Sequence, residues 1–437
     1  MSNIEIGIWS FPILLGMIFL RAPIGLAMIV CGLGGMWLVT GSPLIVLSKL
    51  KTETYSTFSS YSLSIVPIFL LMGHLAGIGG MSRALFKAAE AWLGHRKGGT
   101  AMAAVGACAG FGSICGSSLA TAATMAQVAL PELRRAGYAG GLSTATLAAG
   151  GTLGILIPPS VILVVYATLT EQNIAKLFLA AFVPGILAAL GYALVIAIYV
   201  RLYPASAGRQ PRLPYSERFR ALVSVWPVGV VFVAVVGGIY SGIFTPTEGA
   251  SVGALGTGLI AYASGNLTLS KFRHALLATA GGTAMIFFIV LGAGFFNAFL
   301  ALTQVPQAIS VFVLEQGYGA WTVLTVVLLT YLVLGCFMDS LSMILLTIPI
   351  FFPMMTGLDF GLAPEAMAIW FGILVLIVVE VGLITPPVGM NLFVINAMDR
   401  DTPVHETYFA VLFFLGSDVL RVILLAAFPS ITLFLLA

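Results

Sequence analysis

The stretch Gly150–Ser160, which reads Gly-Gly-Thr-Leu-Gly-Ile-Leu-Ile-Pro-Pro-Ser, interrupts a long run of apolar residues. Its glycines loosen the backbone, and Pro158 and Pro159 carry no amide hydrogen, so carbonyls between Gly154 and Ile157 lose their partners within a helix. Non-helical backbone persists at membrane depth only where protein covers it or where it lines a polar cavity. There the freed carbonyls can bind a cation. The stretch therefore predicts a broken membrane helix at a functional site.

The rest of the chain has the composition of a polytopic membrane protein. Hydrophobic residues make up 60% of its 437 residues, charged residues make up 8%, and the mean hydropathy is +1.09. At about 20 apolar residues per span, the chain has room for roughly ten to fourteen membrane segments and little else. The net charge of +3 argues against binding of nucleic acid. The first residues lack the basic region and cleavage site of a signal peptide, so we expect a membrane span there.

Two apolar stretches have a length that fits a re-entrant hairpin. Gly98–Leu130 would form a helix of about 50 Å, too long for a hydrocarbon core of about 30 Å and too short for two spans. Turn residues occupy its centre, Gly110–Ser118. Trp321–Met355 has a similar length, with Gly335–Ser342 in its middle. We predict a hairpin in each stretch.

Basic residues indicate that the two hairpins enter the membrane from opposite faces. The first hairpin is flanked by Arg96 and Lys97 and by Arg134 and Arg135, which place both of its ends in the cytoplasm. No Lys or Arg lies between Arg273 and Arg400, so both ends of the second hairpin read as periplasmic. Both termini are then expected in the periplasm.

The order of elements repeats, which predicts two inverted halves. A second break, Val381–Gly389, contains Pro386 and Pro387 and matches the first break in position. Inverted repeats with broken helices near the midplane are typical of secondary transporters. Between the second span and the third, Leu44–Ser60 reads as a polar loop. The predicted first repeat, 1–220, comprises scaffold spans 4–80, an interfacial helix 81–97, hairpin 98–133, broken helix 139–168, span 177–200 and a cytoplasmic loop 201–220. The predicted second repeat, 221–437, comprises scaffold spans 223–302, an interfacial segment 303–319, hairpin 320–356, broken helix 366–398 and a final span 407–436.

Four stretches together resemble the large membrane subunit of tripartite ATP-independent periplasmic (TRAP) transporters, and the resemblance covers essentially the whole chain. They are Gly112–Ser118 followed by Ala129–Glu132, then Gly150–Ser160, Gly335–Asp339 and Gly382–Asn391. The resemblance implies an all-α polytopic membrane protein with an elevator-type ion-transporter fold. It also implies sodium-coupled import of an organic anion, without an organic cofactor, across the bacterial inner membrane. The implied partners are a separate small four-span membrane subunit and a periplasmic substrate-binding protein.

Sodium is a hard cation that prefers oxygen ligands, which the hairpin tips and the breaks can supply as carbonyls and hydroxyls. We expect no transition-metal site, and the four cysteines, Cys31, Cys108, Cys115 and Cys336, read as buried small residues. The candidate sodium ligands of the first half are Ser113, Gly116, Ser117, Gly151 and Gly154. Those of the second half are Gly335, Asp339, Gly382, Thr385 and Pro387.

Each candidate also has a structural interpretation. The glycines and serines can simply allow helices to pack closely. Asp339 is an acid inside an apolar stretch, which favours a function, but it can also cap the second helix of its hairpin. Glu380 lies next to the second break and ranks below Asp339, because it can instead hold the broken helix together. His74 reads as a packed polar residue rather than a proton relay.

Helix N-termini at the hairpin tips favour a carboxylate, so we expect the organic anion to bind there. The candidate substrate ligands are Ser118, Ser340 and Asn391. Thr385 can add a further hydrogen bond. We expect no guanidinium inside the membrane core to recognise the anion, which leaves much of the selectivity to the binding protein.

Three alternatives remain at this point. The nearest is a stand-alone sodium–dicarboxylate symporter of similar architecture that needs no binding protein. An intramembrane enzyme would require a base beside Ser117 or a second carboxylate paired with Asp339, and the sequence indicates neither. A channel is disfavoured because hairpins and breaks come as an inverted pair.

Overall fold

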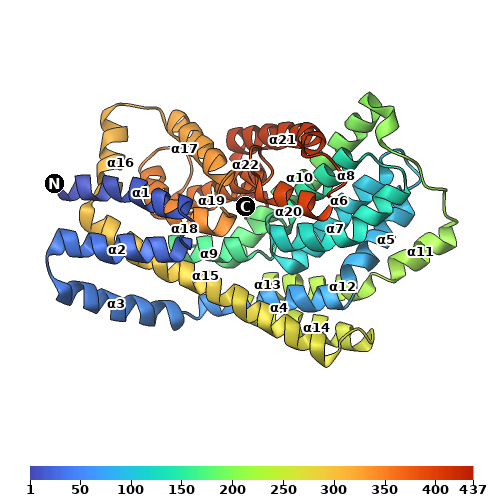
Figure 1. Ribbon diagram of the computed structural model, residues 1–437, viewed down its shortest axis with the longest axis horizontal. Coiled ribbons are helices and arrows are strands. Elements are labelled where there is room, and N and C mark those ends of the chain that lie inside the picture. Colours follow the sequence, from blue (N-terminus) through green and yellow to red (C-terminus); the bar gives the residue numbers. More distant parts are fainter. Residues whose placement is uncertain (437) are drawn as a thin grey trace.

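The computed structural model describes residues 1–436 and, within them, every side chain except that of Leu314. Residue 437, the end of the predicted second repeat, lies outside the described residues. The described chain is helical throughout, as the sequence predicts (Figure 1). The helices of the first half are α1 Asn3–Phe19, α2 Ile24–Thr40, α3 Pro43–Phe58, α4 Ile65–Ile78, α5 Met81–Leu93, α6 Gly99–Cys115, α7 Ser118–Arg135, α8 Gly140–Leu156, α9 Val161–Thr170 and α10 Ile174–Leu202, with short 3₁₀ turns at Ser62–Ser64 and Pro204–Ser206.

The predicted cytoplasmic loop 201–220 is wrong at its far end, because residues from Tyr215 onward form the helix α11. The helices of the second half are α11 Tyr215–Val223, α12 Trp226–Phe232, α13 Gly238–Tyr240, α14 Pro246–Ala263, α15 Leu269–Thr303, α16 Val305–Glu315, α17 Ala320–Gly335, α18 Ser340–Thr356, α19 Pro364–Gly382, α20 Met390–Met398, α21 Val404–Ala427 and α22 Pro429–Leu433. A π-helical turn, Val233–Gly237, joins α12 to α13, and a 3₁₀ turn, Phe434–Leu436, follows α22.

Among residues 1–436, four single helices, α10, α15, α19 and α21, are long and apolar enough to cross a membrane, and the number rises to seven if each of three bent helix pairs is one span. One of these pairs is α8 and α9, which meet at 45° across the break at Ile157–Ser160. The break forms where proline removes amide donors, so the predicted broken helix is confirmed. The peptide bonds Pro158-Pro159 and Pro386-Pro387 are both cis.

The prediction of a loop at Leu44–Ser60 is wrong, because these residues form α3. Pro43 begins the helix, and Lys49 and Glu53 form an ion pair of 2.7 Å one turn apart. The hydroxyls of Thr52 and Ser56 donate to carbonyls of the same helix. Hydroxyls that donate in this way leave the hydrogen bonds of the helix intact. A high content of polar residues therefore did not indicate a loop here.

The helix α15 is a single helix of 35 residues that forms the last part of the predicted scaffold spans 223–302. Thr268 caps its start by accepting a bond from the Lys271 amide at 3.3 Å, so Lys271 and Arg273 lie on the helix rather than in a loop. In Figure 1, α15 runs from α2 and α3 at one end to α4 and α14 at the other. It links the scaffold helices of both halves.

Both predicted hairpins are present, and their second helices begin at a capping side chain. The first consists of α6 and α7, with Gly116 in the left-handed conformation (φ +64°) at its tip and Ser117 as the cap of α7. The second consists of α17 and α18, and Asp339 caps α18. The capping residues Ser117 and Asp339 therefore fix where the second helix of each hairpin begins, and so where each tip lies.

The two halves pack reciprocally. Helix α9, the second part of the first broken helix, packs against α18 of the second hairpin, and α20 packs against α7 of the first hairpin. Outside this pairing, α2 lies along α15 while α14 lies along α4. The fold is thus a duplicated one in which each half completes the other, although the boundary at residue 220 stays a prediction.

Candidate functional site

Each hairpin crosses a broken helix at a pair of glycines. A Cβ on Gly112 would lie 2.9 Å from the backbone nitrogen of Gly154, and a Cβ on Gly382 would lie 2.8 Å from the carbonyl carbon of Gly335. Backbones can approach this closely only because both partners lack a side chain. The interpretation of Gly154, Gly335 and Gly382 as close-packing residues therefore holds, and it places backbone oxygens near the tips.

The first crossing brings together the tip Gly116–Ser117 and the break. A Cβ on Gly116 would lie 3.2 Å from the Pro159 carbonyl oxygen, and one on Gly154 would lie 2.8 Å from the Ser117 carbonyl oxygen. Because residues 158 and 159 are prolines, the carbonyls of Gly154 and Ile155 lack their helical donors. Within residues 1–436, no loop or side-chain donor reaches these two carbonyls.

The other two first-half candidates lie along the same helices. The Ser113 hydroxyl donates to the Gly110 carbonyl at 2.9 Å, which occupies its proton but leaves its oxygen lone pairs. Gly151 faces α7 and α20, since a Cβ there would lie 3.2 Å from Nδ2 of Asn391. The five candidate residues therefore border one crossing of hairpin and break.

The second crossing differs, because its freed carbonyls already have donors. The Gly382 carbonyl accepts a bond from the Thr385 amide at 3.0 Å, and the Leu383 carbonyl accepts one from the Asn391 amide at 3.1 Å. The Thr385 hydroxyl donates to Val381 at 2.7 Å. The carbonyl of Pro387, which is exposed, accepts a bond from the Tyr408 hydroxyl at 2.7 Å. The carbonyls freed by proline at the second crossing thus have hydrogen-bond donors, whereas those at the first crossing have none among the described residues.

Asp339 has the capping contacts that its structural interpretation predicts. Its carboxylate accepts the Ser342 amide at 3.1 Å and the Ser342 hydroxyl at 2.5 Å. The residue remains partly exposed. Capping uses some of its lone pairs and leaves others, so the contacts are compatible with a cation ligand as well.

Glu380 connects the two hairpin tips, a role that the sequence analysis missed. It is fully buried in α19, and one carboxylate oxygen accepts the hydroxyl of Ser118 while the other accepts that of Ser340 at 2.8 Å. These bonds go to the hairpins and not across the break to α20, so the idea that Glu380 holds the broken helix together is wrong. An acid inside an apolar run indicates a functional residue, but the sequence does not show which distant residues it contacts.

The third substrate candidate, Asn391, joins the second half to the first broken helix. Its Nδ2 donates to the Ala148 carbonyl on α8 at 3.2 Å, and its buried Oδ1 has no hydrogen-bond partner. Ser118 and Ser340, in contrast, are both engaged by Glu380. A substrate group that meets all three would have to compete with an internal carboxylate for the two serines.

A cavity of about 1010 Å³ opens beside the first hairpin. Ser117 at the hairpin tip lines it together with Thr124 and Gln127 of α7, so the cavity reaches the tip. His74 of α4 lines it as well, and so do three basic residues. The basic lining residues are Arg83, Lys87 and Lys271. Because these residues come from four separate helices, the sequence alone did not indicate the cavity.

A buried ion pair lies on the final span, contrary to the expectation of a core without guanidinium groups. Arg421 and Asp418 of α21 are 6% and 1% exposed, and their side chains are 2.8 Å apart. The other oxygen of Asp418 accepts the Tyr192 hydroxyl of α10 at 2.8 Å, and that hydroxyl also contacts Thr152 of α8 at 3.0 Å. Arg421 is hard to recognise in the sequence as a core residue, because the surrounding span is otherwise strongly apolar.

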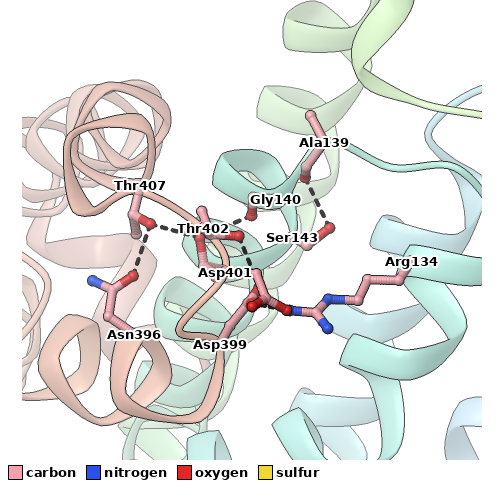
Figure 2. A network of polar contacts seen from close by, with 10 residues as sticks. Arg134, Ala139, Gly140, Ser143, Asn396, Asp399, Asp401, Thr402 and Thr407 are labelled. Atoms are coloured by element: carbon pink, nitrogen blue, oxygen red, sulfur yellow. Dashed lines mark hydrogen bonds and ion pairs between the residues drawn. The ribbon is translucent and has the colours of Figure 1, made fainter.

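A second polar network fastens the end of the first hairpin to the turn between α20 and α21 (Figure 2). Arg134, at the end of α7, pairs with the buried Asp399 and, at 3.1 Å, with Asp401. The Thr402 hydroxyl donates to Asp399 at 2.9 Å, and Thr407 donates to Asn396 at 2.9 Å. The contacts of Arg134 again join the first half to the second. The four cysteines are buried and free, as predicted.

Comparisons with known proteins agree with the resemblance seen in the sequence. The model of the family "Tripartite ATP-independent periplasmic transporter, DctM component" matches residues 11–431. The chain is 38% identical to the C4-dicarboxylate TRAP transporter large permease protein DctM of Pseudomonas aeruginosa, covering 92% of each chain. It is 30% identical to the sialic acid TRAP transporter large permease protein SiaM of Vibrio cholerae, covering 96% of each chain. Among solved structures, the YdaH transporter of Alcanivorax borkumensis shares the fold, with a TM-score of 0.60 and 16% identity over 88% of each chain.

Proposed function

The chain belongs to the DctM component family of TRAP transporters, and we propose that it imports a small organic anion by sodium-coupled secondary transport, with the anion delivered by a periplasmic binding protein. As a member of this family it is a multi-pass protein of the bacterial inner membrane and a transporter rather than an enzyme. The names of the relatives, a C4-dicarboxylate and a sialic acid permease, support a carboxylate as the transported group.

The observation that carries the proposal is the basic cavity beside the first hairpin. It reaches Ser117 at the tip, and Arg83, Lys87 and Lys271 line it. Cationic side chains along a water-filled cavity attract anions and repel cations. We propose that this cavity is the path by which the anion leaves toward the cytoplasm.

Sodium coupling is proposed at the first crossing. The Gly154 and Ile155 carbonyls lack helical donors, and the Ser117 carbonyl lies beside Gly154. These are oxygen ligands of the kind a hard cation takes. The second crossing can contribute through Asp339 and the second lone pairs of its carbonyls.

An elevator movement is the proposed mechanism. The hairpins and broken helices of the two halves interlock through α9 with α18 and α20 with α7, which suits a single moving unit. The helices α2, α4, α14 and α15 pack on one another, which suits a fixed scaffold. We propose that the small four-span subunit packs against this scaffold, where α2 and α3 expose apolar side chains such as Trp37, Leu38 and Leu44.

The test is uptake by the purified chain in liposomes. With the four-span subunit and binding protein present, an inward sodium gradient is expected to drive accumulation of a labelled C4-dicarboxylate or sialic acid, and an equal potassium gradient is not. Uptake that is as fast without the binding protein would instead identify the stand-alone sodium–dicarboxylate symporter. Equal uptake under both gradients would contradict sodium coupling.

The change Asp339→Asn separates capping from cation binding. Asparagine caps helices about as well as aspartate, so the free energy of unfolding is expected to change by less than about 0.5 kcal/mol. Removal of the negative charge is expected to raise the sodium concentration needed for half-maximal uptake by about tenfold, as loss of one charged ligand does. Asp339→Ala serves as the comparison that also loses the cap. Unchanged sodium dependence in Asp339→Asn would leave Asp339 with capping alone.

A further inference from the structure

Glu380 is the one residue that contacts both hairpin tips through its side chain among the described hydrogen bonds. It has no exposed surface and lies two residues before the glycine crossing at Gly382. A carboxylate at membrane depth is costly unless its oxygens are paired, so its partners carry information about its role.

The partners occupy equivalent places in the two halves. Ser118 is the first residue of α7 and Ser340 is the first residue of α18, and each directly follows the capping residue of its helix. Each serine hydroxyl donates to a different oxygen of Glu380. The N-terminal ends of both helices therefore meet at one buried carboxyl group.

The first half has no acid at the matching place. When Pro158-Pro159 is aligned with Pro386-Pro387, Thr152 falls opposite Glu380. Thr152 contacts the Tyr192 hydroxyl at 3.0 Å and donates to Ala149 of its own helix, so among its described bonds it reaches neither hairpin tip. The two hairpins are related by the repeat, but a single side chain from the second half, that of Glu380, contacts both of them.

We propose that Glu380 is a positioning residue that holds the two hairpin tips in one fixed arrangement, so that they move together. If one hairpin moved without the other, an oxygen of the Glu380 side chain would lose its donor while still buried, and an unpaired buried polar group is strongly disfavoured. The proposal rests on the proposed elevator movement for its functional meaning, but the rigid arrangement can be measured independently of transport.

Distance measurements between the hairpins test the proposal. Spin labels are attached at the exposed positions Gln127 on α7 and Val333 on α17, while the native cysteines are buried. In the unchanged protein, pulsed electron spin resonance is expected to give one narrow distance distribution. In the double variant Ser118→Ala, Ser340→Ala it is expected to broaden or to gain a second population. Loss of a hydrogen bond to a charged group lowers the preference for one arrangement by about tenfold.

The control is Ser10→Ala, which removes a buried serine hydroxyl that donates only to Gly7 of its own helix. Its distance distribution is expected to match that of the unchanged protein. Glu380→Gln is measured as well, and because the double serine variant keeps the glutamate, a failure of the glutamine variant to fold leaves the test intact. A folded double serine variant with an unchanged narrow distribution overturns the proposal.

Uptake supplies the second readout. The maximal rate of sodium-driven uptake is expected to fall about tenfold in the double serine variant. Adding Glu380→Gln to that variant is expected to cost little more, because groups of one network are not additive. If the losses of uptake caused by the serine and glutamate changes add fully, the three side chains do not act as one network, which contradicts the proposal. If the unchanged protein shows no sodium-driven uptake, the proposed function fails, while the distance measurements still decide the role of Glu380.

Discussion

Replacing Arg421 by methionine is expected to lower the free energy of unfolding by about 3–5 kcal/mol, because it leaves the buried Asp418 carboxylate without its cation. Arg421 and Asp418 are 6% and 1% exposed and lie 2.8 Å apart, so solvent cannot replace the lost partner. Methionine keeps much of the length of the side chain, which limits the loss of packing. Thermal and chemical unfolding of the purified protein in detergent measures the effect.

The matched control is Arg135→Met at the exposed pair with Glu132. That pair has the same spacing along its helix and the same 2.8 Å separation, but the arginine is 72% exposed. Exposed pairs contribute about 0–1 kcal/mol, so this variant is expected to unfold almost as the unchanged protein does. Equal stability losses in the two variants would show that burial does not set the contribution of the Arg421 pair.

A double substitution separates the ion pair from the general packing of α21. Arg421→Met combined with Asp418→Leu removes both charges, and replacing a buried pair by apolar residues is often neutral. Most of the stability lost in Arg421→Met is therefore expected to return. If the double variant is less stable than Arg421→Met, the loss of stability comes instead from Tyr192, whose hydroxyl no longer has Asp418 as its acceptor.

Gly112→Ala and Gly382→Ala are each expected to destabilise the protein by about 1–3 kcal/mol and to abolish sodium-driven uptake, because a methyl group has no space at either crossing. The new Cβ at position 112 would lie 2.9 Å from the Gly154 nitrogen, and that at 382 would lie 2.8 Å from the Gly335 carbonyl carbon. Neither neighbour is a flexible side chain, so the hairpin must move away from the broken helix. Uptake and thermal unfolding are measured together.

Gly106→Ala is the matched control on the same helix as Gly112. It is exposed, and no heavy atom lies within 4 Å of a Cβ built there. Alanine favours a helix interior over glycine by about 1 kcal/mol, so this variant is expected to be slightly more stable and fully active. The same chemical change thus has opposite signs at two positions of α6. Wild-type uptake by Gly112→Ala would contradict the close crossing.

The sequence predicted both broken helices, both hairpins and most spans, since these depend on residues that are near one another in the chain. Proline lacks an amide hydrogen wherever it stands, and apolar length and terminal glycines act locally. The exception, α3, shows the limit of polarity as a guide, because Thr52 and Ser56 satisfy their hydroxyls within the helix. For the site, the sequence indicated the crossings and the capping residue Asp339. It ranked Glu380 too low and overlooked Arg421.

Glu380 was ranked too low because its partners lie far away in the chain, whereas Arg421 and Asp418 are three residues apart on one helix and only their burial depends on the fold. Ser118 is separated from Glu380 by 262 positions, and Tyr192 is separated from Asp418 by 226. The basic cavity likewise combines residues of α4, α5, α7 and α15. By itself, the sequence determined where the helices break and which segments form hairpins, because local hydrogen bonding and hydrophobic length decide those features. Only the tertiary structure decided which buried charges are paired, because a charge at membrane depth needs a partner and the folding of two halves around each other selects it.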